Sequence, residues 1–327
     1  MRQIRSIDHL RGAAALAVVA FHLTQRLGHP LVVGAAGVDI FFVISGFIMW
    51  ATTAGQKVPP SRFLAHRSLR IVPLYWLVTL GMVGLALVVP GALPRLHPTL
   101  GHVVASLLFL PHLAPDGTTF PVLVPGWTLC YEALFYALFA GGLMVAERRR
   151  FAVVGAVLAV LVMAGLLLRP SQPAAAAYTS PLLLEFVAGM ALAILWRRGT
   201  LRGAAIGRVL LVTGVLALLG LELGRVYSEA WRPLLWGVPA VLIVGGALSA
   251  DFAGWPILDR LGAASYSLYL VHPPLVGAVL SATKRLPMLA SGGICLLAVI
   301  GLGLLCHRFV ERPMTERLRR LIDHRRD

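Results

Sequence analysis

Ten apolar stretches, each long enough to cross a lipid bilayer, constrain the fold of this chain more than any other feature. A spanning helix needs about 17–25 mostly apolar residues, and a segment in lipid must satisfy its own backbone hydrogen bonds by forming a helix. The sequence therefore predicts an all-α polytopic membrane protein with about ten transmembrane helices and no soluble domain. The stretches are residues 8–25, 36–53, 70–90, 127–146, 151–168, 180–196, 207–224, 232–250, 263–283 and 288–309.

Composition supports the same class, because 13% of the residues are charged and 58% are hydrophobic, whereas about 25% of the residues of a soluble domain are charged. The first residues lack a small-residue cleavage site, so we expect the first stretch to be retained rather than removed as a signal peptide. The cysteines lie in apolar stretches without the spacing of a metal site or a disulfide, and we expect no metal. The oligomeric state stays open.

The distribution of positive charge predicts the topology. Residues 101–113 form a shorter apolar stretch followed by prolines, and we expect residues 101–125 to be a re-entrant or interfacial segment of one domain, 1–327. With ten spans and a cytoplasmic N-terminus, 22 of the 29 Lys and Arg residues fall on the cytoplasmic side and 7 on the other, as the positive-inside rule requires. We therefore expect both termini in the cytoplasm, and the basic tail, 311–327, against anionic lipids rather than nucleic acid.

Arg11 and His22 place two costly polar groups in the first apolar stretch. Eleven residues separate them, which corresponds to about three helical turns and about 16 Å, so both side chains share one face. Ionisable groups within a membrane are expensive and usually functional. A neutral imidazole suits general base catalysis, and the alternative is a structural histidine hydrogen-bonded between helices.

Two acids, Asp39 and Glu132, lie near the outer ends of their stretches in this topology, close to the depth of His22. We expect the three groups to form an acid and base cluster. Either carboxylate can instead stabilise a helix N-terminus, where the helix dipole favours negative charge.

Arg67 and Arg70 lie at the inner end of the third stretch and share a helix face through their i, i+3 spacing. Guanidinium groups in such a pair suit a phosphate ligand. The alternative is that they serve only the positive-inside topology.

His272 lies within the ninth stretch, with Tyr269 one turn before it and two prolines directly after it. We consider His272, Tyr269 and Trp127 as candidates for a substrate wall. A histidine that packs at a proline kink is the alternative.

Together these residues resemble the acyltransferase-3 family of bacterial integral-membrane O-acyltransferases. Six motifs occur in the order of that family and cover essentially the whole chain. They are Asp8-x-x-Arg11-Gly with His22, Gly37-Val-Asp39-Ile-Phe-Phe-Val-Ile-Ser-Gly46, Arg67-x-x-Arg70-Ile-x-Pro73-x-Tyr75, Trp127-Thr-Leu-x-x-Glu132-x-x-Phe-Tyr136, Tyr266-Ser-Leu-Tyr269-Leu-x-His272 and Glu311-Arg-Pro313.

The resemblance implies a catalytic His22 supported by Arg11, and contacts from Arg67 and Arg70 to the phosphates of acyl-CoA. It implies a protein of the bacterial inner membrane that uses acyl-CoA, with acetyl expected, as a co-substrate and holds no bound cofactor. The acceptor implied is a hydroxyl of a cell-surface polysaccharide, glycolipid or other carbohydrate, most like that of the short exopolysaccharide acyltransferases. One departure is His66, which stands where many members have arginine.

Alternatives stay open for both the catalytic mechanism and the functional class of the protein. His22, oriented by Asp39 or Glu132, can act as a general base in direct transfer or form an acyl-histidine intermediate. Ten spans with buried ionisable groups also describe a proton-coupled transporter or flippase, although no motif repeats between the two halves. Asparagine is absent, which excludes a His/Asn catalytic pair, and no histidine begins a His-x4-Asp motif.

Overall fold

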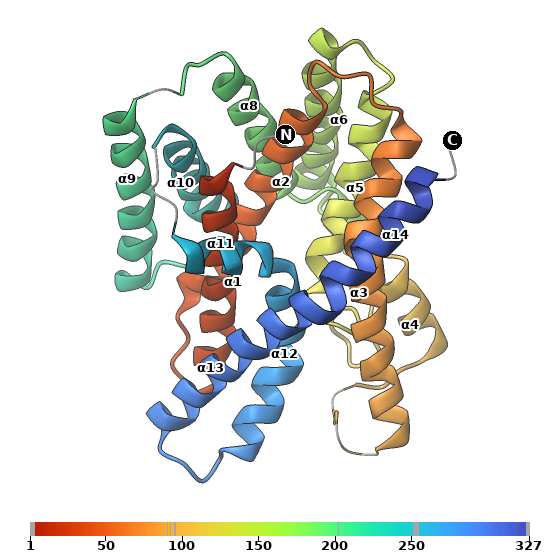
Figure 1. Cartoon of the computed structure of the whole chain (residues 1–327), viewed down its shortest axis with the longest axis vertical. Helices are drawn as coiled ribbons and strands as arrows, with labels where there is room; N and C mark the ends of the chain where they lie inside the picture. The colour runs from red at the N-terminus through yellow and green to blue at the C-terminus, as the bar shows by residue number, and fades with distance from the viewer. Residues whose placement is uncertain are drawn as a thin grey trace. The chain divides into compact units, whose positions relative to one another are not determined.

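Every regular element that the structure describes is a helix, as the apolar stretches predict (Figure 1). This computed structural model describes residues 4–89, 91, 93–94, 96–201, 203–250 and 255–324. Some of the arginines counted for the topology, and the end of the expected basic tail, lie outside the described residues: Arg2, Arg95, Arg202 and residues 325–327.

Each of the ten predicted stretches overlaps one of the longer helices. These are α1 (Arg5–Arg26), α2 (Gly37–Thr53), α3 (Pro60–Val88), α5 (Gly126–Gly142), α6 (Glu147–Leu168), α8 (Leu183–Arg197), α9 (Ala204–Leu223), α10 (Val238–Ser249), α12 (Ser265–Ala282) and α13 (Met288–Cys306). The remaining elements are the 3₁₀ turn η1 (Val32–Ala36), α4 (Leu100–Leu107), α7 (Pro173–Tyr178), the π-helical turns η2 (Pro233–Gly237) and η3 (His307–Glu311), α11 (Pro256–Ala263) and α14 (Arg312–His324).

Six helical segments in the described ranges are long and apolar enough to cross a membrane, or seven if α11 and α12, which meet at a bend of 70°, form one span. An all-α chain with several apolar helices is therefore confirmed, but this number falls short of the predicted ten. The helix α1 is outside the six because its polar residues, among them Arg11 and His22, lower its mean hydropathy.

Residues 101–125, expected to be re-entrant or interfacial, contain all of α4 except its first residue and then turns without a further helix. The eight residues of α4 rise about 12 Å, less than half of the roughly 30 Å hydrocarbon core. This segment therefore adds no spanning helix.

The chain divides into two compact units, and it passes from one to the other three times. The first unit comprises Met1–Lys57 and Leu184–His307, and the second comprises Val58–Leu183 and Arg308–Asp327. The expectation of one domain over residues 1–327 stays a prediction.

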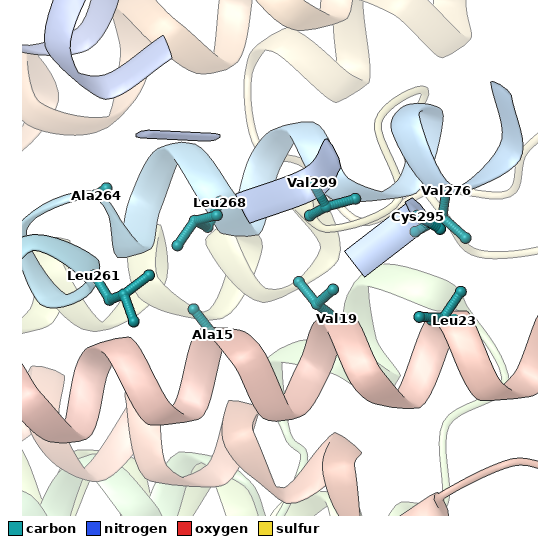
Figure 2. Packing of buried hydrophobic residues seen from close by; sticks show 9 residues of the cluster. All are labelled: Ala15, Val19, Leu23, Leu261, Ala264, Leu268, Val276, Cys295 and Val299. Atoms are coloured by element: carbon teal, nitrogen blue, oxygen red, sulfur yellow. The ribbon is translucent and has the colours of Figure 1, made fainter. Parts of the chain in front are cut away.

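The first unit is built around α1, which packs against η1, α2, α11 and α12 (Figure 1). Ala15, Val19 and Leu23 recur every four residues along α1 and are almost fully buried. Figure 2 shows these side chains turned toward Leu268 of α12 and Val299 of α13. Lipid tails are as apolar as these side chains, so close van der Waals packing, rather than transfer out of water, stabilises the contacts on this face of α1.

In the second unit, α3 packs against α5 through aromatic rings. The ring centroid of Phe63 lies 5.3 Å from that of Phe139 and 6.3 Å from that of Tyr136. The amphipathic α14 also packs on α3. The expected basic tail therefore forms a helix that lies against its own unit.

Two glycines bring α2 and α8 close together in the first unit. A Cβ atom added at Gly46 would lie 2.1 Å from the carbonyl oxygen of Phe186, and one added at Gly189 would lie 2.0 Å from that of Val43. Such distances are too short for real Cβ atoms, so the two backbones touch, as in small-residue interfaces between membrane helices.

We expect Gly46→Ala and Gly189→Ala each to destabilise the protein by about 1–3 kcal/mol, because the added methyl group forces the helices apart. The matched control is Gly301→Ala on α13, where a Cβ would have nothing within 4 Å. SDS-induced unfolding of the purified protein measures the difference in the free energy of unfolding between each variant and the unsubstituted protein. An unchanged transition for Gly46→Ala would contradict this packing.

Candidate functional site

Two imidazoles from helices far apart in the sequence meet in the first unit. His22 of α1 and His272 of α12 have ring centroids 5.1 Å apart. His272 is fully buried and His22 is half-buried. Val19, one turn before His22, belongs to the buried face of α1. The helix face that carries His22 is therefore packed against neighbouring helices. The structure thus joins the predicted base to a residue predicted only as part of a substrate wall.

The proline after His272 explains how the His272 ring is held. The helix α12 continues through Pro273, which has no N–H, so the carbonyl of Tyr269, four residues earlier, lacks its helical donor. Nδ1 of His272 lies 2.8 Å from that carbonyl oxygen. Because a carbonyl oxygen only accepts, Nδ1 carries the hydrogen, and Nε2 of the neutral ring is an acceptor. This buried Nε2 has no hydrogen-bond partner among the described residues.

Arg11 lies near the start of α1, and its charge is compensated locally. Its Nη1 atom is 3.6 Å from Oδ1 of Asp8, one turn earlier, and both side chains are largely buried. Beside them, Nε2 of His9 lies 2.9 Å from Oδ1 of Asp259 on α11. Arg11 is therefore paired within its own helix, about 16 Å along the axis from His22, and it is His9 that links α1 to α11.

Asp39, predicted to orient His22, forms a buried ion pair with Arg232. Nε of Arg232 lies 3.2 Å from Oδ1 of Asp39, and Nη2 lies 2.9 Å from Oδ2. The guanidinium carbon also lies 4.9 Å from the ring centroid of Trp236. Such a bidentate pair is geometrically specific, and here it ties η2 to the first turn of α2. A role of Asp39 toward His22 stays a prediction.

Glu185 of α8 is the buried acid that the sequence analysis missed. It is 3% exposed, and its charged neighbours are Asp39 and Arg232. A Cβ at Gly237 would lie 2.9 Å from Oε1 of Glu185, so glycine permits this approach. The signal was available, because Glu185 is the one charged residue in the stretch 180–196.

Arg67 and Arg70 lie one turn apart on α3 in the second unit. The guanidinium carbon of Arg67 is 5.7 Å from the ring centroid of Phe63, and its buried Nε has no hydrogen-bond partner among the described residues. Its charged neighbours are Arg70, Glu132 of α5 and Arg319 of α14. Three guanidinium groups and one carboxylate leave an excess of positive charge, which suits an anion such as phosphate.

Glu132 has a charged neighbour that the sequence did not predict. The sequence placed Glu132 near an outer helix end and Arg67 at an inner one, whereas the structure makes them electrostatic neighbours. The reason is that α3 begins at Pro60, about three turns before the apolar stretch, so Arg67 lies within the helix. The proposed catalytic role of Glu132 stays a prediction.

The three candidates for a substrate wall fall in different units. Tyr269 lies beside His272, with ring centroids 5.9 Å apart, and its ring also contacts that of Phe41 at 5.7 Å. Trp127 is on α5 of the second unit, where its ring centroid is 5.8 Å from that of Tyr131. Their role as a wall stays a prediction.

Comparisons with known proteins give one consistent family. Residues 4–308 match the model of the acyltransferase-3 family, described as an acyltransferase domain. Exopolysaccharide production protein ExoZ of Rhizobium meliloti (strain 1021) is 41% identical over 91% of this chain and 94% of its own length. Acyltransferase MdmB of Streptomyces mycarofaciens is 28% identical over 95% of this chain and 91% of its own length. Peptidoglycan O-acetyltransferase OatA of Listeria monocytogenes serovar 1/2a is 26% identical over 96% of this chain and 56% of its own length. No solved structure matches.

We expect Arg232→Met to destabilise the protein by about 3–5 kcal/mol, because it leaves the buried carboxylate of Asp39 without its counter-ion. Adding Asp39→Leu removes both charges and should recover much of the loss. Arg285→Met, at an exposed position of the same unit, is the control. SDS-induced unfolding gives the stability of Arg232→Met, of Asp39→Leu alone, of the double variant and of the control. A double variant whose loss equals the sum of the two single losses would argue against the pair.

Proposed function

The chain belongs to the acyltransferase-3 family, and we propose that it transfers an acyl group, acetyl in this proposal, from acyl-CoA to a hydroxyl of a cell-surface polysaccharide, glycolipid or other carbohydrate. Membership of the family makes the protein an acyltransferase, and its apolar helices make it a multi-pass membrane protein. The relatives support a saccharide acceptor, since one is an exopolysaccharide production protein and another a peptidoglycan O-acetyltransferase.

The observation that carries this proposal is the contact between the rings of His22 and His272 inside the first unit. In the proposed reaction, His22 takes the proton of the acceptor hydroxyl while the hydroxyl oxygen attacks the thioester carbon. The C–S bond then breaks, and the CoA sulfur leaves and receives the proton from His22. Nε2 of His272, an acceptor without a partner among the described residues, can hold the N–H of His22 or the incoming hydroxyl.

The proposed donor site uses Arg67 and Arg70. The phosphates of acyl-CoA carry several negative charges, and the excess of guanidinium groups around Arg67 provides the opposite charge. CoA would act as a co-substrate, and the proposed reaction needs no bound cofactor.

We propose ten spans in the bacterial inner membrane with both termini in the cytoplasm. Four helical segments beyond the six apolar ones overlap predicted stretches and bring the number to ten: α1, α5, η2 with α10, and α11 with α12. In this topology Arg67, Arg70 and the arginines of α14 belong to cytoplasmic-side segments, where acyl-CoA and anionic lipids are present.

His22→Ala should abolish acyl transfer, because the acceptor hydroxyl loses its base, an effect of about 10²–10⁴-fold. Binding of acyl-CoA should persist. His97→Ala, in an exposed loop, is the control. Transfer of radiolabelled acetyl from acetyl-CoA by the purified protein measures the rate, and retained turnover in His22→Ala would contradict the assignment.

Replacing both Arg67 and Arg70 by Gln should raise the KM for acyl-CoA by roughly a hundredfold or more, since each phosphate contact from a charged group contributes about 1.5–3 kcal/mol. Arg62→Gln, at an exposed position of the same helix, tests for a general effect of charge. If the double variant keeps the KM of the unsubstituted protein, these arginines serve topology alone.

A further inference from the structure

A cavity of about 480 Å³ lies in the first unit, where the segment after α1, the turn η1, the end of α9 and the turn η2 come together. Its volume is within the range of about 300–1,000 Å³ that is typical of small-ligand sites. Its lining begins at Gly28, two residues beyond the end of α1 at Arg26, and His22 lies about one turn before that end. The lining therefore follows directly on the helix that carries the proposed base and does not contain that base.

The wall of the cavity combines an aromatic surface with both signs of charge. Tyr227 and Trp236 line it with ring centroids 5.4 Å apart, and Tyr227 is 49% exposed. Glu222, Arg225 and His29 supply the polar groups. A carboxylate accepts hydrogen bonds and a guanidinium donates them, which matches hydroxyl groups, while the C–H face of a sugar ring packs on an aromatic ring.

The balance of charge argues against a polyanionic ligand in this cavity. Glu222 offsets Arg225, so the lining carries no excess of positive charge comparable with that around Arg67. A phosphate-rich molecule such as CoA would find one guanidinium and one opposing carboxylate. A neutral, hydroxyl-rich ligand fits this lining better.

Two groups of the wall, Glu222 and Trp236, are held in place before a ligand arrives. Oε2 of Glu222 accepts a hydrogen bond of 2.7 Å from the backbone N–H of Val33. Trp236 packs against the guanidinium of Arg232, and that guanidinium is fixed by both carboxylate oxygens of Asp39. A wall that needs little ordering on binding favours affinity.

We propose that this cavity binds a saccharide unit of the acceptor that neighbours the acylated sugar. The inference rests on the acyltransferase function proposed above and adds the place where the acceptor is recognised. In this inference the Asp39–Arg232 ion pair also supports the saccharide site, because it holds Trp236 at the wall of the cavity.

Binding of saccharides in the absence of acyl-CoA tests the cavity separately from the reaction. The first probe is a set of exopolysaccharide fragments from the bacterium that contains this protein, deacetylated with base. The second is a set of lipid-linked saccharides extracted from the membranes of the same bacterium. We expect at least one probe to bind the full-length protein in detergent, and Tyr227→Ala to weaken its Kd by about tenfold. Tyr227→Phe keeps the ring and should retain most of the affinity.

Trp231→Ala is the matched control, because Trp231 is an exposed aromatic residue of the same loop, 62% exposed, and lies outside the cavity lining. It should leave the Kd unchanged. In transfer assays, Tyr227→Ala should raise the KM for the acceptor and leave the KM for acetyl-CoA as it was.

Two results would overturn the inference: that neither probe binds the unsubstituted protein, or that Tyr227→Ala binds as tightly as Trp231→Ala. Saccharide binding without any acyl transfer would contradict the proposed function and leave the cavity as a saccharide site. Binding of the lipid-linked probe alone would identify a lipid-linked acceptor.

Discussion

The buried ion pair between Asp39 and Arg232 is the contact on which the arrangement of the first unit depends. Removing charges from water costs several kcal/mol per ion, and the cost is offset only when geometry and hydrogen bonds are good. Here the bidentate contact fixes the start of α2 to the turn before α10, and Glu185 from α8 lies beside it. Asp39, which the sequence suggested for chemistry, therefore helps to determine how three apolar helices meet, together with Arg232 and Glu185, which the sequence did not suggest.

The same physical rule accounts for His272. A proline inside α12 removes one backbone donor, and the imidazole supplies the missing hydrogen bond to the carbonyl of Tyr269. This bond selects the tautomer and leaves Nε2 as an acceptor beside His22. A structural explanation for His272 and a functional one are therefore compatible, because the bond to the backbone sets the orientation that the proposed reaction uses.

The sequence predicted the helices well, because apolar length and periodicity are local properties, and it placed His22 on a face that is packed in the structure. It did not predict that His22 and His272 meet, since the choice of partner helix depends on side-chain fit between distant segments. It missed Glu185, although a single acid in an apolar stretch is the same signal that identified Asp39. It also began the third helix too late, because charged residues before Ile71 interrupt the apolar pattern without ending the helix.

In the proposed reaction, the acyl group starts at arginines on the cytoplasmic side and reaches a base in the outer half of the membrane. Reconstitution into proteoliposomes of one protein orientation tests this path, with radiolabelled acetyl-CoA enclosed on the side of the termini and a deacetylated exopolysaccharide acceptor on the opposite side. We expect labelled acceptor although donor and acceptor never share a compartment. Labelling that occurs only when both are on the same side would contradict it.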